Sequence, residues 1–480
     1  MDVAFGTDGW RTTVDEFTTP RIRAVGQAVA DYVREHADGP MAPDDLGVVV
    51  GYDPREGSRG AAEELSRVLA ANGIDAYLPR RDTPTPVVAW TVLDRGLDGA
   101  LQVTASHNPP EYNGIKFVPA DGAPALPAVT DWLADHLRAP DPRAESEQGR
   151  VHEVDLLEPY LEHALAFVRD AGVENAQDVE GAPDLSGVTV AYDAMHGSGR
   201  GVTDALLERA DAEVVRLRTE ADPTFGGTPP EPSADRLGDL AERVAAGAAD
   251  LGIANDGDAD RIAVATPDRG VVDANWLFAA LYDHLIAAAD PAPGAGDAVR
   301  TVSTTFLIDR LAEAHGQSAH ETPVGFKWVA AAMADHDALV GGEESGGFGV
   351  RGHLRNKDGI LVALLVAAAH AVEPLDDRLD RIRDAHGDIV QDRISVACPD
   401  ARKAGVIERL DDEIPDTVAG TAVESVGTAD GFKLRLADGS WLLVRPSGTE
   451  PKLRVYAEAG DRERLAELLD AGVELVEPLV

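Results

Sequence analysis

Gly47-VVVGYDPREGSRGAAEEL and Gly187-VTVAYDAMHGSGRGVTDALL are two copies of one pattern. Each begins with an apolar run typical of a buried strand, passes through a turn that contains glycine, and ends in an amphipathic stretch typical of a helix. The two copies align almost residue for residue across Tyr-Asp and Gly-Ser, and Val299-RTVSTTFLIDRLAEAHG repeats the same order. The sequence therefore predicts three related α/β units.

Each predicted unit is followed, some tens of residues later, by a second short strand that leads into a polar loop. The strands are Gly99-ALQVT, Ala249-DLGIAN and His336-DALVGG, and their loops are Ala105-SHNPPEYNGIK, Asp256-GDADR and Glu343-ESGG. Ligands of open α/β sheets bind beyond the carboxyl ends of strands. We therefore expect the three loops to face one shared cleft.

After about Glu373 the sequence changes to a helix rich in Asp and Arg, followed by strands, and it closes with a helix. The strands lie in Gly431-FKLRLADGSWLLVRPSGTEPKLRVYAEA, where Asp438-Gly439 predicts a hairpin turn. This part is predicted to be a fourth, smaller α+β unit. The predicted domains are 1–148 with the serine loop, 149–268 with the aspartate loop, 269–375 with the glutamate loop and 376–480 with a phosphate-binding loop.

The chain of 480 residues is strongly acidic, with 85 Asp and Glu against 43 Lys and Arg and a net charge of −42. This charge is spread along the whole length, so we expect the surface to repel nucleic acid and anionic membranes. Carboxylates stay hydrated in concentrated salt, where their mutual repulsion is screened. The composition therefore predicts a halophilic protein.

Cys398 is the only cysteine, which excludes an intrachain disulfide and a cysteine-based zinc cluster. We also find neither the pattern of a signal peptide nor an uncharged stretch long enough to span a bilayer. The longest apolar run, 360–372, is interpreted as a buried helix. Together these features predict a cytoplasmic protein.

Asp256, Asp258 and Asp260 alternate along the loop that follows one of the predicted strands. Such spacing lets three carboxylates converge on one hard cation, and oxygen ligands suit Mg²⁺. A calcium loop of the EF-hand type requires Gly at its sixth and Glu at its twelfth position, where this chain has Arg261 and Pro267. A metal site is favoured here over the remaining alternative, a solvated acidic turn.

Ser106 lies in Thr-Ala-Ser-His-Asn-Pro-Pro, where two prolines hold the following backbone extended, and Lys116 follows a few residues later. An exposed, rigid serine is a candidate nucleophile. The alternative is a turn in which the serine bonds only to its own backbone. The neighbouring metal loop and lysine favour the nucleophile.

The segment Arg445-PSGTEPKLR combines hydroxyls, a glycine, a lysine and two arginines, which together can bind a phosphate dianion. An ordinary turn between strands is the alternative. Glu343-ESGG offers acceptors and a hydroxyl suited to sugar hydroxyl groups, and Gly325-FKW places Lys327 between aromatic residues.

Six motifs in this order resemble the alpha-D-phosphohexomutases, the family that contains phosphoglucomutase, phosphomannomutase and phosphoglucosamine mutase. They are Phe5-GTDGWR, Thr104-ASHNPPEYNGIK, Asp256-GDADR, Gly342-EESGG, Lys357-DG and Arg445-PSGTEPKLR. The resemblance covers essentially the full length. It implies an α/β protein of three related domains with mixed sheets, and a smaller C-terminal α+β domain that resembles the TATA-box-binding fold, all arranged around one cleft.

The resemblance also implies roles for particular residues. Ser106 would carry the phosphoryl group, and Mg²⁺ would be bound by that serine with Asp256, Asp258 and Asp260. Arg11, Arg261 and Lys116 would stabilise the charge of the transition state, and Lys116, ahead of His107, would transfer protons. The substrate would be bound by Lys327, Glu343, Ser345, Arg445, Ser447, Gly448, Thr449 and Arg454.

The implied reaction interconverts hexose 1-phosphate and hexose 6-phosphate through a phosphoserine enzyme and a hexose 1,6-bisphosphate, which is both intermediate and activator. Glu344 and Lys327 favour glucose phosphate as the substrate, with mannose phosphate also accepted. The alternatives are a phosphoglucosamine mutase, a metal-dependent sugar phosphatase and a non-catalytic sugar-phosphate binder. The sequence makes no prediction of the oligomeric state.

Overall fold

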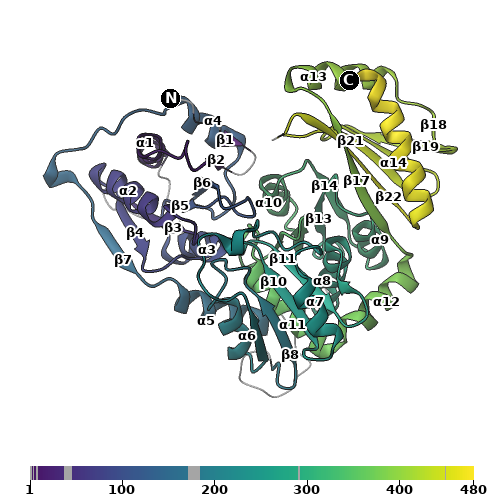
Figure 1. Ribbon diagram of the computed structural model, residues 1–480, viewed down its shortest axis with the longest axis horizontal. Helices are drawn as coiled ribbons and strands as arrows, with labels where there is room; N and C mark the ends of the chain where they lie inside the picture. Colours follow the sequence, from purple (N-terminus) through teal and green to yellow (C-terminus); the bar gives the residue numbers. More distant parts are fainter. Residues whose placement is uncertain are drawn as a thin grey trace.

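The structure is a computed structural model that describes residues 3, 5–6, 9–36, 46–170, 184–289, 292–448 and 450–480. Within these ranges the backbone forms four β-sheets with flanking helices. The N-terminal sheet and the C-terminal sheet lie at opposite sides of the molecule, and the other two lie between them (Figure 1).

The first sheet has the strand order β1-β2-β6-β5-β3-β4-β7. Its strands are β1 (Phe5–Gly6), β2 (Gly9–Thr13), β3 (Gly47–Tyr52), β4 (Asp75–Pro79), β5 (Gly99–Val103), β6 (Tyr112–Pro119) and β7 (Val151–Val154). Its helices are α1 (Thr19–His36), α2 (Ser58–Ala71), α3 (Thr85–Arg95) and α4 (Pro127–Asp135), with a 3₁₀ turn at Glu145–Glu147. The strand β7 begins after the predicted end of the first domain at 148 and pairs in parallel with β4.

The second sheet has the order β12-β11-β10-β8-β9. Its strands are β8 (Thr189–Asp193), β9 (Glu213–Leu217), β10 (Leu251–Asn255), β11 (Ile262–Thr266) and β12 (Gly270–Val271). The helices of this part are α5 (Leu157–Asp170), α6 (Thr203–Arg209) and α7 (Gly238–Ala245), with a 3₁₀ turn η2 at Phe225–Gly227.

The third sheet has the order β14-β13-β15-β16. Its strands are β13 (Ala298–Thr301), β14 (Ala319–Thr322), β15 (Val340–Gly342) and β16 (Phe348–Val350). The accompanying helices are α8 (Ala274–Ala289), α9 (Leu307–Ala314), α10 (Phe326–Asp335), α11 (Gly359–Val372) and α12 (Leu375–His386).

The first three sheets share one local topology, which confirms the predicted repeat. In each, a central strand has a parallel neighbour on either side, and one of these neighbours pairs antiparallel with the strand that follows it. The corresponding sets are β4-β3-β5-β6, β9-β8-β10-β11 and β14-β13-β15-β16. The three polar loops follow the equivalent strands β5, β10 and β15, so the repeat places them at corresponding sheet edges.

The fourth sheet is antiparallel at every pairing described, with the order β17-β22-β21-β20-β19-β18. Its strands are β17 (Val390–Ala397), β18 (Thr417–Val418), β19 (Thr421–Gly427), β20 (Phe432–Leu436), β21 (Trp441–Pro446) and β22 (Lys452–Ala459). The helices are α13 (Asp400–Asp412) and α14 (Arg462–Val476), with a 3₁₀ turn at Glu477–Leu479. The predicted hairpin turn lies between β20 and β21, where Gly439 has a φ of 82°.

The strand β3 shows how the first sheet is covered on both faces. Val48 and Val50 enter an apolar core with residues of α1 and α2. Val49 points to the other face and joins a core that continues through α3 into the second and third parts of the chain. Successive side chains of a strand point to opposite faces, so one short apolar run joins two cores.

The apolar run 360–372 lies within α11, which contacts α5, α6, α8 and the strands β10 and β11. The helix is therefore buried, as predicted, and it packs against the second sheet. In the described ranges no single helix is long and apolar enough to cross a membrane, although α11 and α12 pass a test of length and composition as a pair bent by 82°. The fold class is confirmed: three α/β domains with mixed sheets and a C-terminal domain with an antiparallel sheet.

Candidate active site

Loops from the three α/β domains meet at one place. We call them the serine loop (residues 104–111), the aspartate loop (256–261) and the glutamate loop (343–347). The Ser106 hydroxyl donates a hydrogen bond of 2.8 Å to Asp256 Oδ2. The backbones are also close, because a Cβ added at Gly257 would lie 2.7 Å from the Ser106 carbonyl oxygen. On the other side, the amide of Ile262 donates to the Gly346 carbonyl at 3.0 Å.

The three carboxylates of the aspartate loop form a compact buried group. Asp256, Asp258 and Asp260 each offer a ligand atom, and these atoms lie within 4.8 Å of one another. Lys116 Nζ lies 2.9 Å from Asp258 Oδ2 and 3.1 Å from Asp260 Oδ2, and Lys357 Nζ lies 3.1 Å from the same Asp260 oxygen. All of these residues are buried. Because the ammonium groups and the carboxylates neutralise one another, the protein can bury this many charged groups.

The carboxylates differ in their affinity for protons. Burial and the charges of Asp258 and Asp260 raise the pKa of Asp256 well above its usual range. Burial also acts to raise the pKa of Asp258, but the Lys116 ammonium and the Thr85 hydroxyl, which donates at 2.6 Å, more than offset this and lower it. Such crowding of like charges favours a bound cation.

The donor set fits a divalent cation. The buried Oδ1 atoms of Asp258 and Asp260 have no hydrogen-bond partner, although buried polar atoms are normally paired. The available ligands are all oxygens, the type that Mg²⁺ prefers. The predicted metal ligands, including Ser106, therefore lie together at one buried point.

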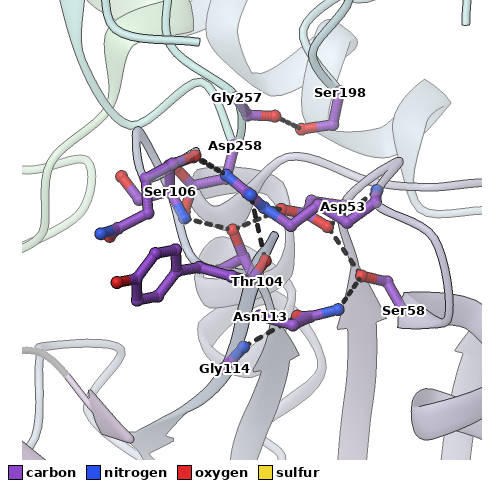
Figure 2. Close-up of polar contacts among 12 residues, drawn as sticks. Asp53, Ser58, Thr104, Ser106, Asn113, Gly114, Ser198, Gly257 and Asp258 are labelled. Atoms are coloured by element: carbon purple, nitrogen blue, oxygen red, sulfur yellow. Dashed lines mark hydrogen bonds and ion pairs between the residues drawn. The ribbon is translucent and has the colours of Figure 1, made fainter. Parts of the chain in front are cut away.

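Ser106 has a strained backbone, with a φ of 52° that residues with a side chain seldom adopt. Its amide donates to the Thr104 hydroxyl at 2.8 Å, which helps to hold this conformation. Figure 2 shows Ser106 above Thr104 and to the left of Asp53, with Gly257 and Asp258 above it. The serine side chain is thus held toward the aspartate loop.

His107, Arg11 and Arg261 surround the same point. His107 Nδ1 lies 3.3 Å from Ser106 Oγ, and the Arg11 guanidinium donates to Asn108 Oδ1 at 3.1 Å. The charge of Arg261, then burial and the charge of Arg11, lower the pKa of His107 far below its usual value. The imidazole is therefore neutral at pH 7 and sits among cations, an environment suited to a phosphoryl group.

The glutamate loop lies next to the aspartate group. A Cβ at Gly347 would come within 2.4 Å of Lys357 Cδ and 3.6 Å of Glu343 Oε2, so glycine leaves the room that this lysine occupies. The Ser345 hydroxyl points toward Glu343 Oε2 at 3.5 Å. The charge of Glu343 also contributes to the raised pKa of Arg261. Glu343 thus interacts electrostatically with Arg261 of the centre, and Ser345 lies next to Glu343.

The predicted phosphate-binding residues form a separate group on the fourth sheet. Arg445 on β21 and Arg454 on β22 are opposite each other in the strand register. Asp430 Oδ2 accepts from Arg445 Nε and Nη2 at 2.9 and 2.8 Å, and Glu450 Oε2 accepts from Arg454 at 2.9 Å. We call Arg445, Arg454 and residues 447–451 the clamp. Ser447 and Gly448 lie in its loop, whereas Thr449 falls outside the described residues.

The described contacts join Ser106, His107, Lys116, Arg11, Arg261 and the three aspartates, but they do not join the clamp to this centre. Lys327 lies at the start of α10, with its ammonium 5.8 Å from the centre of the Trp328 ring.

Sequence reasoning missed several residues of the centre. Lys357 contacts Asp260, and Thr85 reaches Asp258 with both its hydroxyl and its amide. Arg55 and Asp53 lie beneath the serine loop. The scarcity of lysine is a signal for Lys357, which also lies in one of the six motifs. No sequence signal identifies Thr85, because its contact depends on how α3 meets the second domain.

Comparison with known proteins agrees with the site. Profiles described as phosphoglucomutase/phosphomannomutase α/β/α domains I, II and III match residues 2–144, 159–270 and 273–385, and the C-terminal domain of that family matches 394–475. A probable phosphoglucosamine mutase of Methanopyrus kandleri is 32% identical over 99% of this chain and 98% of that protein. A phosphoglucomutase/phosphomannomutase of Thermococcus kodakarensis is 30% identical over 99% of both chains.

Among solved structures, the putative phosphomannomutase from Thermus thermophilus superposes with a TM-score of 0.82, at 29% identity over 99% of both chains. The fold and the relatives together define a phosphotransferase that moves a phosphoryl group within its substrate, which is an isomerase. The chain belongs to the alpha-D-phosphohexomutase superfamily, with the four domains of phosphoglucomutase/phosphomannomutase.

Proposed function

We propose that this enzyme interconverts hexose 1-phosphate and hexose 6-phosphate through phosphorylated Ser106 and a hexose 1,6-bisphosphate. Sugar phosphates are the substrates that the family implies. The observation that carries the proposal is the 2.8 Å contact between Ser106 Oγ and Asp256 within the buried group of carboxylates and ammonium groups. A hydroxyl at the edge of a cation site is the arrangement that phosphoryl transfer from serine requires.

We assign Mg²⁺ to Asp256, Asp258, Asp260 and the phosphorylated serine. When bound, it would supply positive charge to the transferring phosphoryl oxygens. The Oδ1 atoms of Asp258 and Asp260 support this assignment, because they are buried and accept no hydrogen bond.

The side chains around Ser106 have complementary roles in the proposed reaction. Arg11, Arg261 and Lys116 stabilise the charge that spreads over the phosphoryl oxygens in a loose transition state. Lys116 and His107 are our candidates for holding the proton of the sugar hydroxyl, and neutral His107 is already close to Ser106 Oγ. The buried aspartate group keeps bulk water away from the serine, because both Ser106 and Asp256 have an exposed fraction of 0%.

The clamp would bind the phosphate that does not react. Arg445 and Arg454, opposite each other on β21 and β22, present two guanidinium groups that match a phosphate dianion. Ser447, Gly448 and Thr449 would add hydrogen bonds from the loop, whereas Glu343, Ser345 and Lys327 would bind the sugar. After the first transfer the bisphosphate turns end for end, and its other phosphate returns to Ser106.

The choice of sugar is proposed separately. Glu344 suggests glucose phosphate by its position in the motif, but its carboxylate accepts from the Thr301 and Thr304 hydroxyls at 3.2 and 3.3 Å. The name of the Methanopyrus relative points instead to glucosamine phosphate. The neighbouring carboxylates of Glu343 and Glu344 would attract the ammonium group of this sugar. We therefore propose glucosamine phosphate as the preferred substrate, ahead of glucose and mannose phosphates.

The test is to incubate the purified enzyme with Mg²⁺ and a trace of glucose 1,6-bisphosphate, and then with glucosamine, glucose or mannose 1-phosphate in turn. Formation of the 6-phosphate supports a mutase, and the ratio of kcat/KM values ranks the sugars. Release of inorganic phosphate without isomer would instead indicate a phosphatase. Binding without turnover would indicate a silent sugar-phosphate binder, and either result would overturn the proposal.

The net charge of −42 supports two further proposals, a cytoplasmic location in a salt-rich cell and a dependence of stability on salt. Repulsion between carboxylates in the folded state is screened by molar salt. The melting temperature should rise steadily with KCl concentration. A melting temperature that is as high in dilute buffer would contradict the halophilic interpretation.

A further inference from the structure

The guanidinium group of Arg55 lies beneath the serine loop, and each of its five N–H groups has a nearby acceptor. Four of these acceptors are carbonyl oxygens at or beside the loop. Nη2 donates to Ser106 at 2.6 Å and Asn108 at 2.7 Å, Nη1 to Pro109 at 2.6 Å and Tyr112 at 3.1 Å, and Nε to Asp53 Oδ2 at 2.9 Å. The Arg55 side chain is 1% exposed. The loop is therefore folded around a single buried cation.

Asp53 connects this cation to the beginning of the loop. Its carboxylate accepts from the Thr104 and Ser58 hydroxyls, each at 2.8 Å, and Thr104 in turn accepts from the Ser106 amide. Figure 2 shows Asp53 between the hydroxyls of Ser58 and Thr104, with Ser106 next to Thr104. Ser106 is thus held on both sides, through its amide by Thr104 and through its carbonyl by Arg55.

This support acts on a strained residue. The φ of 52° at Ser106 lies in the left-handed region, which is energetically unfavourable for a residue with a side chain. Such a conformation persists only when its surroundings enforce it. Four carbonyl oxygens that converge without a cation would repel one another, so removal of the guanidinium should release the loop.

The second domain closes the other side of Arg55. The ring of Phe225, from the 3₁₀ turn η2, lies 4.8 Å from Arg55 Cζ, and Phe225 is 2% exposed. This domain also carries Gly257, whose backbone approaches the Ser106 carbonyl. Arg55 therefore fixes the serine loop relative to the aspartate loop as well as to its own sheet.

The repeat shows that the fold itself does not need this arginine. In the second domain Asp193 corresponds to Asp53 and accepts from the amide of Met195, as Asp53 accepts from that of Arg55. Met195 stands where the first domain has Arg55, and Asp193 is neutralised by Arg218 from another strand end. The corresponding turn thus forms without an arginine at this position, although its backbone differs, because Met195 and His196 have φ values of 45° and 60°. The arginine is present in the copy that carries the serine.

We propose that Arg55 is a positioning residue that holds Ser106 Oγ at the aspartate group and thereby directs the phosphoryl group to the sugar and away from water. The inference rests on the proposed function. In the mutase step the sugar oxygen bonds to phosphorus as the bond from phosphorus to Oγ breaks; the sugar hydroxyl gives its proton to a base, and Oγ takes up a proton to become the Ser106 hydroxyl. In the competing step water attacks instead, which gives inorganic phosphate and the free Ser106 hydroxyl.

The main variant is Arg55→Lys, which keeps the charge but cannot reach four carbonyl oxygens in one plane. The matched control is Arg200→Lys. Arg200 forms a largely buried ion pair with Asp82 at 2.7 Å between the first two domains, and it does not bind the serine loop in the described contacts. All measurements are made with Mg²⁺ present. The first gives kcat and KM, and the second gives the ratio of inorganic phosphate to isomer formed from enzyme phosphorylated with glucose 1,6-bisphosphate. The third is the amide hydrogen exchange of residues 104–112.

For Arg55→Lys we expect kcat to fall about 10²-fold, because a displacement of about 1 Å has an effect of that size. KM should change by less than about threefold, since the clamp is untouched. The ratio of hydrolysis to transfer should rise at least about tenfold, and exchange of the loop amides should become faster. Arg200→Lys should change neither the ratio nor the exchange. An unchanged ratio and unchanged exchange in Arg55→Lys would overturn the proposal.

Asp53→Asn provides a second route if Arg55→Lys does not fold. It preserves the shape of the side chain and weakens the pairing with Arg55, so the same changes should appear with smaller size. Equal ratios and exchange rates in this variant and the wild type would also overturn the proposal. Failure of the proposed function is distinguishable: the wild-type enzyme would then form no phosphoserine, and amide exchange alone would report whether Arg55 positions the loop.

Discussion

The reaction centre and the clamp are built in different ways. The centre is assembled from three loops whose backbones touch, on domains that share one continuous apolar core. The clamp belongs to a domain with a core of its own, and a small apolar group that includes Phe306 and Trp441 joins it to the third domain. Figure 1 shows the fourth sheet set apart from the others, at the end of the chain.

Polar contacts also link the third and fourth domains, and they include hydrogen bonds of the Gln391 side chain, on β17, with Asn275 and the Ser303 carbonyl. The Val324 amide donates to Asp430 at 3.2 Å, Lys433 lies 2.9 Å from Glu321, and the Phe306 amide donates to Glu458 at 3.2 Å. Domains joined in this way commonly move relative to each other. Under the proposed function, this difference means that the reaction centre is preformed, whereas the clamp can move as the bisphosphate turns.

The largest effect is expected at Ser106 in the preformed centre. Ser106→Ala removes the acceptor of the phosphoryl group and should lower kcat by at least about 10³-fold. Ser66→Ala is the control, because the buried Ser66 hydroxyl donates within α2, to the Ala62 carbonyl. Turnover of Ser106→Ala close to that of the control would show that the centre is not where the transfer occurs.

A smaller loss is expected at the cation site. Asp258→Asn removes one charge from the group and should weaken Mg²⁺ binding and lower kcat, each by roughly 10²-fold. Calorimetric titration with Mg²⁺ measures the affinity. Asp98→Asn is the control, because Asp98 is also buried but binds the Gly47 amide at 2.8 Å in another part of the first domain. Equal affinities in the two variants would refute the metal assignment.

The clamp should respond differently. Asp430 Oδ2 orients Arg445 and also binds Val324, two residues before α10. Asp430→Asn should therefore raise KM about tenfold and change kcat little, because a hydrogen bond to a charged group contributes about 1.5–3 kcal/mol. The control is Asp438→Asn, which removes a surface ion pair with Arg464 in the same domain. A drop in kcat with constant KM would show that the clamp and the centre act as one unit.

The smallest effect is expected at Lys433, where the fourth domain contacts the third. Burial and the charge of Arg300 lower the pKa of Lys433 to about 8, and Glu321 and Glu458 act in the opposite direction. In the unfolded chain Lys433 keeps this proton up to a pH near 10.5. Between pH 8 and 10.5 the unfolded state therefore binds more protons than the folded state. The free energy of unfolding rises with pH in this range, by about 1 kcal/mol per pH unit. Thermal melts of the wild type and Lys433→Met from pH 7 to 10 should show this gain in the wild type alone.

Local sequence was sufficient for much of the centre. Alternating aspartates after a strand, a serine held by prolines and a lysine a few residues later are each local patterns, and the repeat placed their loops at equivalent sheet edges. The expectation that Ser106 and the aspartates meet is met by the hydrogen bond between Ser106 and Asp256. Thr85 and Phe225 could not be predicted in this way, since their contacts arise where separate domains pack together.

The amino-acid sequence by itself determined the three α/β units, the order of the functional loops and the residue types that they present, because these depend on hydrophobic periodicity and on neighbours along the chain. Tertiary structure alone decided that Asp258 would face Lys116 and that Arg55 would have four loop carbonyls around it. Those outcomes depend on distances between residues far apart in the chain, which are set by packing and by the pairing of buried charges.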